Sequence, residues 1–322
     1  MRSMKFFAAG LIALSAPAMA QTADEGARIV SDPLYLPLEG EVYGDTGYTY
    51  GWTTKDTFDD LGALSSRTGT NFNAVSQSVL YGATDDLALQ FGWGYDTLAA
   101  GRHVVGDGVV QHSSSSWTNP QFGLVYRLMD QRESPLTLDL RADYAPDIFS
   151  AKTPALPPDV LGAPGGQTLD LGATLGHEGD VMTLAAVFDA YWRGPRSIDN
   201  PNSGGATRTD SLWNYRIGLV SQARLTDAIS INAGAGHTFA TDANVFNDST
   251  GLGHITTGGD MTDVNAALNY QVLPNRVVAS LEYQHNFYQN SRNLFPLLSV
   301  NDTSTRNKDE DLFGVRLRYV LP

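Results

Sequence analysis

The stretch ISINAGAGHTF, residues 229–239, decides the fold. Apolar side chains stand at every second position, and the positions between them carry Ser, Asn, Gly and Thr. A repeat of two is the period of a β-strand that presents an apolar face and a polar face. Similar segments cover residues 44–52, 87–95, 122–128, 136–144, 169–175, 182–192, 213–219, 264–272, 279–287 and 313–319, while the phase of residues 72–82 is ambiguous.

These segments are joined alternately by short turns and by long polar stretches. Short polar turns recur about every 48 residues, at 83–86, 129–134, 177–180, 225–228 and 273–276. Strands of about ten residues joined in this way are typical of transmembrane β-barrels, and a sheet in lipid must close because unpaired backbone amides are costly there. We therefore predict an all-β fold: a closed antiparallel transmembrane β-barrel of about 12 strands. It has short periplasmic turns, and its long outer loops are residues 53–68, 96–116, 145–166, 194–210, 240–261 and 289–309.

The tryptophans favour this fold over the alternative, a soluble β-sandwich or jelly roll. Trp52, Trp93, Trp117, Trp192 and Trp213 all lie at the long-loop ends of predicted strands. An aromatic girdle at the boundary between membrane and water explains this placement. A sandwich predicts neither this placement nor an apolar face on every strand.

The N-terminus predicts export. Residues 1–20, MRSMKFFAAGLIALSAPAMA, contain two basic residues, a short apolar run and the cleavage residues Ala18 and Ala20, as signal peptides do. We expect three parts: a signal peptide at 1–20, a periplasmic N-terminal lead at 21–39 and the barrel at 40–322. Removing the signal peptide would change the net charge from −14 to −16. The predicted location is the outer membrane of a Gram-negative bacterium.

Composition and motifs exclude several classes of function. Lys and Arg number 21 against 35 Asp and Glu, so the chain is not a nucleic-acid binder. Because it has no cysteine, it can form no disulfide, thiolate nucleophile or cysteine-based metal site. No P-loop, G-x-G-x-x-G turn or HExxH motif is present, and we expect no cofactor, no specific metal site and no catalytic residue.

Charged residues alternate with the apolar face and should point into the lumen. Positive and negative charges are nearly balanced there, which favours a network of ion pairs. Whether these residues only stabilise the wall or also line a solute path stays open. The candidates are Arg127, Asp139, Arg141, Asp143, Asp170, Asp189, Arg193, Arg216, Asp263, Glu282, Arg316 and Arg318.

Four short phrases resemble known barrels. Residues 312–319, LFGVRLRY, resemble the C-terminal signal read by the barrel assembly machinery, although Val320, Leu321 and Pro322 follow the aromatic residue. Residues 32–37, 81–86 and 119–128 resemble strand and turn phrases of outer-membrane transporters linked to phenol meta-pathway degradation. That resemblance covers about a tenth of the chain and implies a barrel that transports a small organic solute.

The predicted function is passive passage of a small organic solute through an outer-membrane channel. A 12-stranded lumen lies between a filled 8-stranded barrel and an open porin, so we expect a constricted passage. Expected partners are outer-membrane lipid and lipopolysaccharide, the assembly machinery and the solute, and the acidic outer loops are candidate sites for divalent cations.

Two alternatives remain: a non-conducting structural or surface-interaction barrel, and an outer-membrane lipid hydrolase. The second is raised by His237 and His285, which fall on the lipid-facing side. Because no serine accompanies them at that height and no G-x-S-x-G motif is present, we predict that the chain is not an enzyme.

Overall fold

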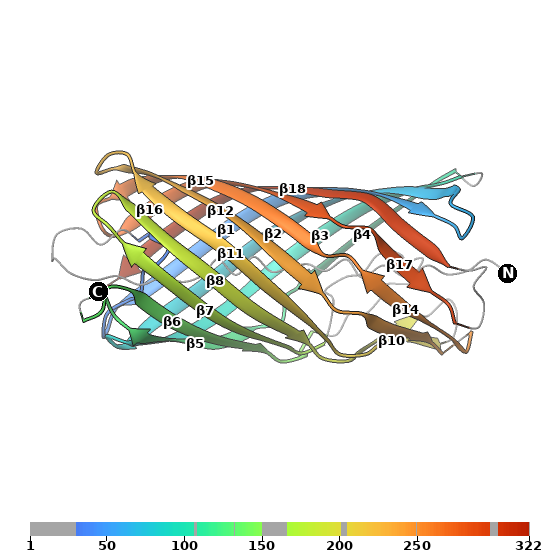
Figure 1. Ribbon diagram of the computed structural model, residues 1–322, viewed down its shortest axis with the longest axis horizontal. Helices are drawn as coiled ribbons and strands as arrows, with labels where there is room; N and C mark the ends of the chain where they lie inside the picture. The colour runs from blue at the N-terminus through green and yellow to red at the C-terminus, as the bar shows by residue number, and fades with distance from the viewer. Residues whose placement is uncertain are drawn as a thin grey trace.

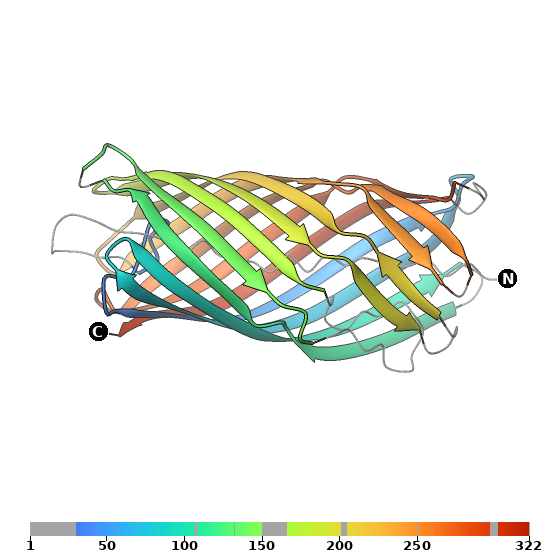
Figure 2. The ribbon, with the colours of Figure 1, turned by 90° about the horizontal axis from the view of Figure 1, so that it is seen from below.

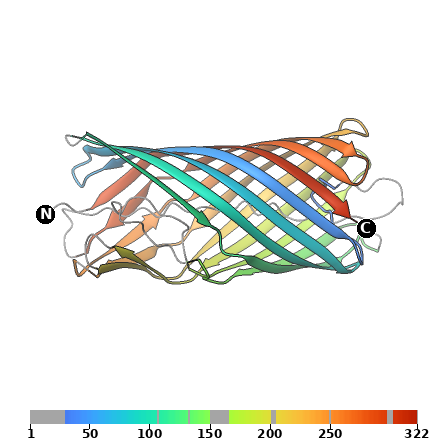
Figure 3. The same ribbon diagram turned by 180° about the vertical axis from the view of Figure 1, so that it is seen from behind.

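The computed structural model describes residues 30–105, 108–131, 133–149, 166–200, 205–248, 250–296 and 302–321. These residues form one antiparallel sheet that curls into a long barrel (Figures 1 and 2). The first and last strands pair along most of their lengths, from Val42 with Leu321 to Phe58 with Ser304. Figure 3 shows this seam, where blue β1 lies beside red β18. The barrel is therefore closed, as predicted.

The sheet contains 18 strand segments among the described residues. They are β1 (Val42–Phe58), β2 (Leu64–Thr84), β3 (Leu87–Val104), β4 (Gly108–Trp117), β5 (Gln121–Met129), β6 (Thr137–Ala145), β7 (Thr168–Glu178), β8 (Met182–Arg193), β9 (Arg196–Asn200), β10 (Gly205–Thr209), β11 (Leu212–Arg224), β12 (Ile229–Ala240), β13 (Ala243–Asn247), β14 (Leu252–Gly258), β15 (Met261–Leu273), β16 (Val277–Tyr288), β17 (Ser291–Leu294) and β18 (Thr303–Leu321).

Breaks of two or three residues divide six barrel strands into two segments each, so the described chain crosses the barrel 12 times. The breaks are at residues 118–120, 194–195, 210–211, 241–242, 259–260 and 289–290. Short turns at residues 85–86, 130–136, 179–181, 225–228 and 274–276 join the strands at the other end. The predicted strand number and short turns are confirmed.

Most of the predicted long outer loops are paired strand extensions rather than irregular loops. β1 continues as far as Phe58, and β2 begins already at Leu64. Beyond the breaks, the segments β10, β13, β14 and β17 pair with one another (Figure 1). Strand lengths had been inferred from the thickness of the hydrocarbon layer. Beyond that layer a hairpin needs no apolar face, so the alternation disappears although the backbone pairing continues. The predicted loop at 145–166 lies largely outside the described residues.

The two faces of the sheet have opposite character. Large apolar side chains are exposed on the outside, as at Leu219 and Leu281, whereas most buried side chains inside are polar or charged. This inversion matches a wall with lipid outside and a polar interior. It also settles the phase of β2, because Val75 and Tyr81 are exposed and Leu80 is buried. No helix among the described residues is long and apolar enough to cross a membrane.

Candidate functional site: the barrel lumen

The largest ion-pair network among the described residues lies on β6, β7, β8, β11 and β15. On β6, Arg141 lies 3.0 Å from Asp143, 2.8 Å from Asp170 of β7 and 3.0 Å from Asp189 of β8. Asp189 lies 3.6 Å from Arg216 of β11, which in turn lies 2.9 Å from Asp263 of β15. The network crosses neighbouring strands as a belt, and its partly buried carboxylates are compensated by two guanidinium groups.

Glycine makes room for this belt. A Cβ atom on Gly236 of β12 would lie 2.6 Å from Nη2 of Arg216, closer than real Cβ contacts allow. The guanidinium group therefore lies flat over the backbone of the neighbouring strand, within reach of Asp263. The glycine-rich stretch 234–236 is explained by this close approach.

A second cluster stabilises the closing seam. Arg316 and Arg318 of β18 each form ion pairs with Asp45 of β1 and Glu282 of β16, at 2.8–3.2 Å. Asp45 was missed by the sequence analysis. Alternation could have found it, since Asp45 lies on the face opposite to Tyr48, Tyr50 and Trp52.

Residues 30–38 lie inside the barrel at the short-turn end; we call them the luminal segment (dark blue in Figure 2). Thr183 of β8 donates to Asp32 at 2.6 Å. Gln222 of β11 and Asn232 of β12 bind Ser31, both at 3.0 Å. These contacts hold the start of the segment against one side of the lumen.

The rest of the luminal segment crosses to the opposite side. Arg127 of β5, which pairs with Asp139 at 2.9 Å, also donates to the carbonyl of Leu34 at 3.2 Å. Leu34 and Tyr35 are 1% and 3% exposed. Gly40 and Glu41 then bond to the backbone of Gly82 of β2. The segment thus spans the lumen before β1 begins.

The sequence predicts residues 21–39 as a periplasmic lead that precedes the barrel. The structure places residues 30–38 inside the lumen, and residues 21–29 lie outside the described residues. Alternation could not indicate this position, because the segment is not a strand. The one available signal was the apolar run at Leu34, Tyr35 and Leu36, which needs burial away from water.

Eleven of the twelve predicted lumen residues take part in ion pairs with carboxylates or guanidinium groups of the described chain. Arg193 is the exception. It lies near the long-loop end of β8, on the same face as Asp189, and its Cζ is 5.8 Å from the ring centroid of Tyr191. The structure distributes these twelve residues over the belt, the seam cluster, the Arg127–Asp139 pair and Arg193. Their role in a solute path stays a prediction.

The predicted girdle residues form ring contacts on the outer wall. Trp52 stacks on Phe313 at 5.4 Å, and Trp192 lies 6.5 Å from Trp213 across the β8–β11 pair. Trp93 contacts Phe91, and Trp117 contacts Tyr95 edge-on. The signal peptide with Ala18 and Ala20 lies outside the described residues.

The two outer-wall histidines are bound to acceptors on neighbouring strands. His237 Nδ1 lies 2.9 Å from Thr262 Oγ1, and His285 Nδ1 lies 2.8 Å from Asp311 Oδ1. No serine is among the hydrogen-bond partners that either ring has in the described chain. His285 is oriented by a carboxylate and has no hydroxyl group among these partners, whereas His237 contacts the threonine hydroxyl of Thr262.

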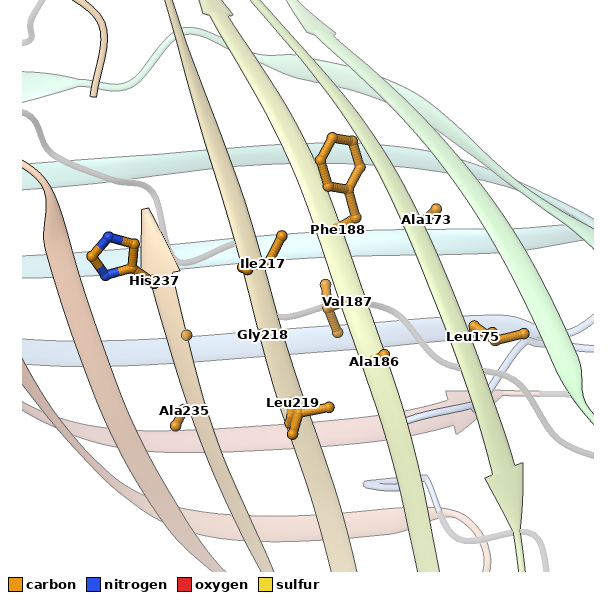
Figure 4. A pocket seen from close by; sticks show the side chains of 11 residues that line it. Ala173, Leu175, Ala186, Val187, Phe188, Ile217, Gly218, Leu219, Ala235 and His237 are labelled. Atoms are coloured by element: carbon orange, nitrogen blue, oxygen red, sulfur yellow. The ribbon is translucent and has the colours of Figure 1, made fainter. Parts of the chain in front are cut away.

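The outer wall also has a shallow apolar hollow of about 620 Å³ on β7, β8, β11 and β12. Figure 4 shows that small residues such as Ala186 and Ala235 form it beside the larger Phe188, Ile217 and Leu219. Most of these side chains are on the membrane side of the sheet, so the hollow is separate from the lumen. Among the described residues, no group of three or more His, Asp or Glu could hold a metal ion. Cation binding by the outer loops stays a prediction.

No protein-family model and no curated protein sequence matches the chain. Solved structures do match. The COG4313 outer membrane channel from Pseudomonas putida F1 is 16% identical, with a TM-score of 0.56, and the match covers 94% of this chain and 100% of that one. The transport unit of the autotransporter AIDA-I from Escherichia coli is 10% identical, with a TM-score of 0.58 and 95% of each chain covered. These matches show the fold, which is that of a Gram-negative outer-membrane β-barrel.

Proposed function

We propose that this barrel is a channel for passive passage of a small organic solute across the outer membrane, with the luminal segment as its constriction. The observation that carries the proposal is that the lumen accommodates this additional segment between its walls. Wall side chains alone do not fill a barrel of 12 strands, which is wider than the filled 8-stranded type. A space that holds a peptide segment has the width that a small solute needs.

The attachment of the luminal segment suits a removable constriction. Its described side-chain contacts with the wall include hydrogen bonds at Ser31, Asp32 and the Leu34 carbonyl. Water can replace hydrogen-bond partners of this kind, so each contributes only about 1 kcal/mol net. These hydrogen bonds are therefore exchangeable with water, while burial of Leu34 and Tyr35 favours the position inside the lumen. We expect the wall, which is held by strand pairing and the ion-pair belt, to stay closed when the segment is displaced.

The similarity to a solved outer-membrane channel supports the proposal at the level of fold. The resemblance to transporters of phenol meta-pathway degradation points to an organic solute. The same luminal segment also supports the alternative, a non-conducting barrel, because it occupies the short-turn end of the lumen. That the chain is not an enzyme stays a prediction.

Conductance separates the two candidates. The mature protein is reconstituted in planar bilayers, and the Ser31→Ala/Asp32→Ala variant is compared with wild type. Channel function predicts measurable openings in wild type and more frequent openings in the variant. Persistent closure of both proteins, with folding confirmed by heat-modifiable gel mobility, contradicts the proposal and leaves the structural barrel.

A further inference from the structure

Arg193 differs from five arginines that lie deeper in the lumen. Arg127, Arg141, Arg216, Arg316 and Arg318 each have a carboxylate within 4.0 Å. Arg193 has none among the described residues, although the chain carries 35 acidic residues against 21 basic ones. In so acidic a protein, a buried guanidinium group without a carboxylate indicates that another anion can take that place.

Without a bound anion, the buried charge of Arg193 destabilises the fold. Arg193 is only 6% exposed, and its Nε has no hydrogen-bond partner in the part of the chain that the structure describes. Arg196, the next inward arginine, is also buried and is repelled by the positive charge of Arg193. Buried charged donors and like charges both destabilise a fold unless an opposite charge compensates them. A bound anion would compensate the charge of Arg193.

The neighbouring ring suggests what kind of anion fits. Tyr191 lies two residues before Arg193 on the same inner face of β8. The Arg193 guanidinium carbon lies 5.8 Å from the centroid of the Tyr191 ring. A planar guanidinium group binds a planar carboxylate through two parallel hydrogen bonds. The Tyr191 ring offers an aromatic surface for the organic part of the same molecule.

We propose that Arg193 and Tyr191 form a binding site for a small organic carboxylate at the long-loop end of the lumen. The site deepens the proposed function by naming the solute class, and it rests on that function only for the claim that the carboxylate passes through. Binding itself can be measured without transport.

The test uses 4-fluorobenzoate and its neutral analogue 4-fluorobenzyl alcohol, observed by ¹⁹F NMR with the mature protein in detergent. Four proteins are compared: wild type, Arg193→Gln, Arg193→Lys and Arg208→Gln. Arg208 is the matched control, because it is an exposed arginine on β10 that pairs with Asp248 at 2.9 Å. Heat-modifiable gel mobility checks that every variant folds.

Wild type should bind the carboxylate more tightly than the alcohol. Loss of a charge-assisted hydrogen-bond pair should weaken carboxylate binding about tenfold or more in Arg193→Gln, less in Arg193→Lys and not in Arg208→Gln. Equal binding by wild type and Arg193→Gln, an equal loss in Arg208→Gln, or no binding by wild type would overturn the proposal. Uptake into liposomes is measured separately: binding without uptake would refute the channel function and leave the site standing.

Discussion

The inner and outer parts of the lumen hold their charges differently. From the short-turn end to the middle, Arg127, Arg141, Arg216, Arg316 and Arg318 are paired with carboxylates, and the luminal segment lies on this paired wall; Arg224, whose Nε has no hydrogen-bond partner within the described residues, is an exception. Near the long-loop end, Arg193 lies beside Tyr191 with no carboxylate at salt-bridge distance in the described chain. The comparison separates two roles for charge: paired groups hold the wall together, and a charge without a carboxylate is available to a ligand.

The largest expected effect is on the paired part. Arg141→Met leaves Asp143, Asp170 and Asp189 facing one another without their shared guanidinium group. Removing one partner of a buried ion pair costs about 3–5 kcal/mol, so the free energy of unfolding should fall by about 3 kcal/mol or more. Urea unfolding in detergent, followed by tryptophan fluorescence, measures it. A loss below about 1 kcal/mol would contradict the view that this belt holds the wall.

A smaller effect on stability is expected where the luminal segment meets the wall. Thr183→Val removes the hydroxyl that donates to buried Asp32, which should lower the free energy that holds the segment in the lumen by about 1–2 kcal/mol. Limited proteolysis near residue 30 should become faster, while urea unfolding of the barrel changes little. Unchanged proteolysis would mean that other contacts hold the segment.

The smallest effect is expected at the exposed pair on the strand extensions. Arg208→Gln breaks the contact with Asp248, but the Arg208 side chain is 66% exposed. Exposed ion pairs contribute about 0–1 kcal/mol, so unfolding in urea should shift by no more than about 0.5 kcal/mol. A loss as large as that of Arg141→Met would remove the distinction between paired lumen charges and surface charges.

The sequence predicted those parts of the fold that lipid imposes. Alternation such as that of residues 229–239 marks every strand that has an apolar outer face, which gave the strand number, the short turns and the closed barrel. It could not show the outer hairpins, because segments such as β10 and β14 have no lipid to face. Nor could it place the luminal segment, whose contacts join residues as distant in the chain as Ser31 and Asn232.

The candidate site was predictable to a similar degree. The alternation along each strand assigns a charged side chain to the inner face. It does not show which carboxylate lies beside which guanidinium group. Register decides this: Arg141 reaches Asp189 two strands away only because β6, β7 and β8 pair as they do. The difference between Arg193 and the paired arginines is therefore visible only in three dimensions.

The central claim is that solute passes through the lumen when the luminal segment moves. Because the chain has no native cysteine, the segment can be tethered with one engineered disulfide, Leu34→Cys with Gly176→Cys. A Cβ atom on Gly176 would lie only 2.9 Å from the Leu34 Cδ atoms, which Leu34→Cys removes, so the two sites are neighbours. Single-channel conductance in planar bilayers should be absent in the oxidised protein and should appear on reduction. Conductance that is the same before and after reduction, whether present or absent, would contradict the account.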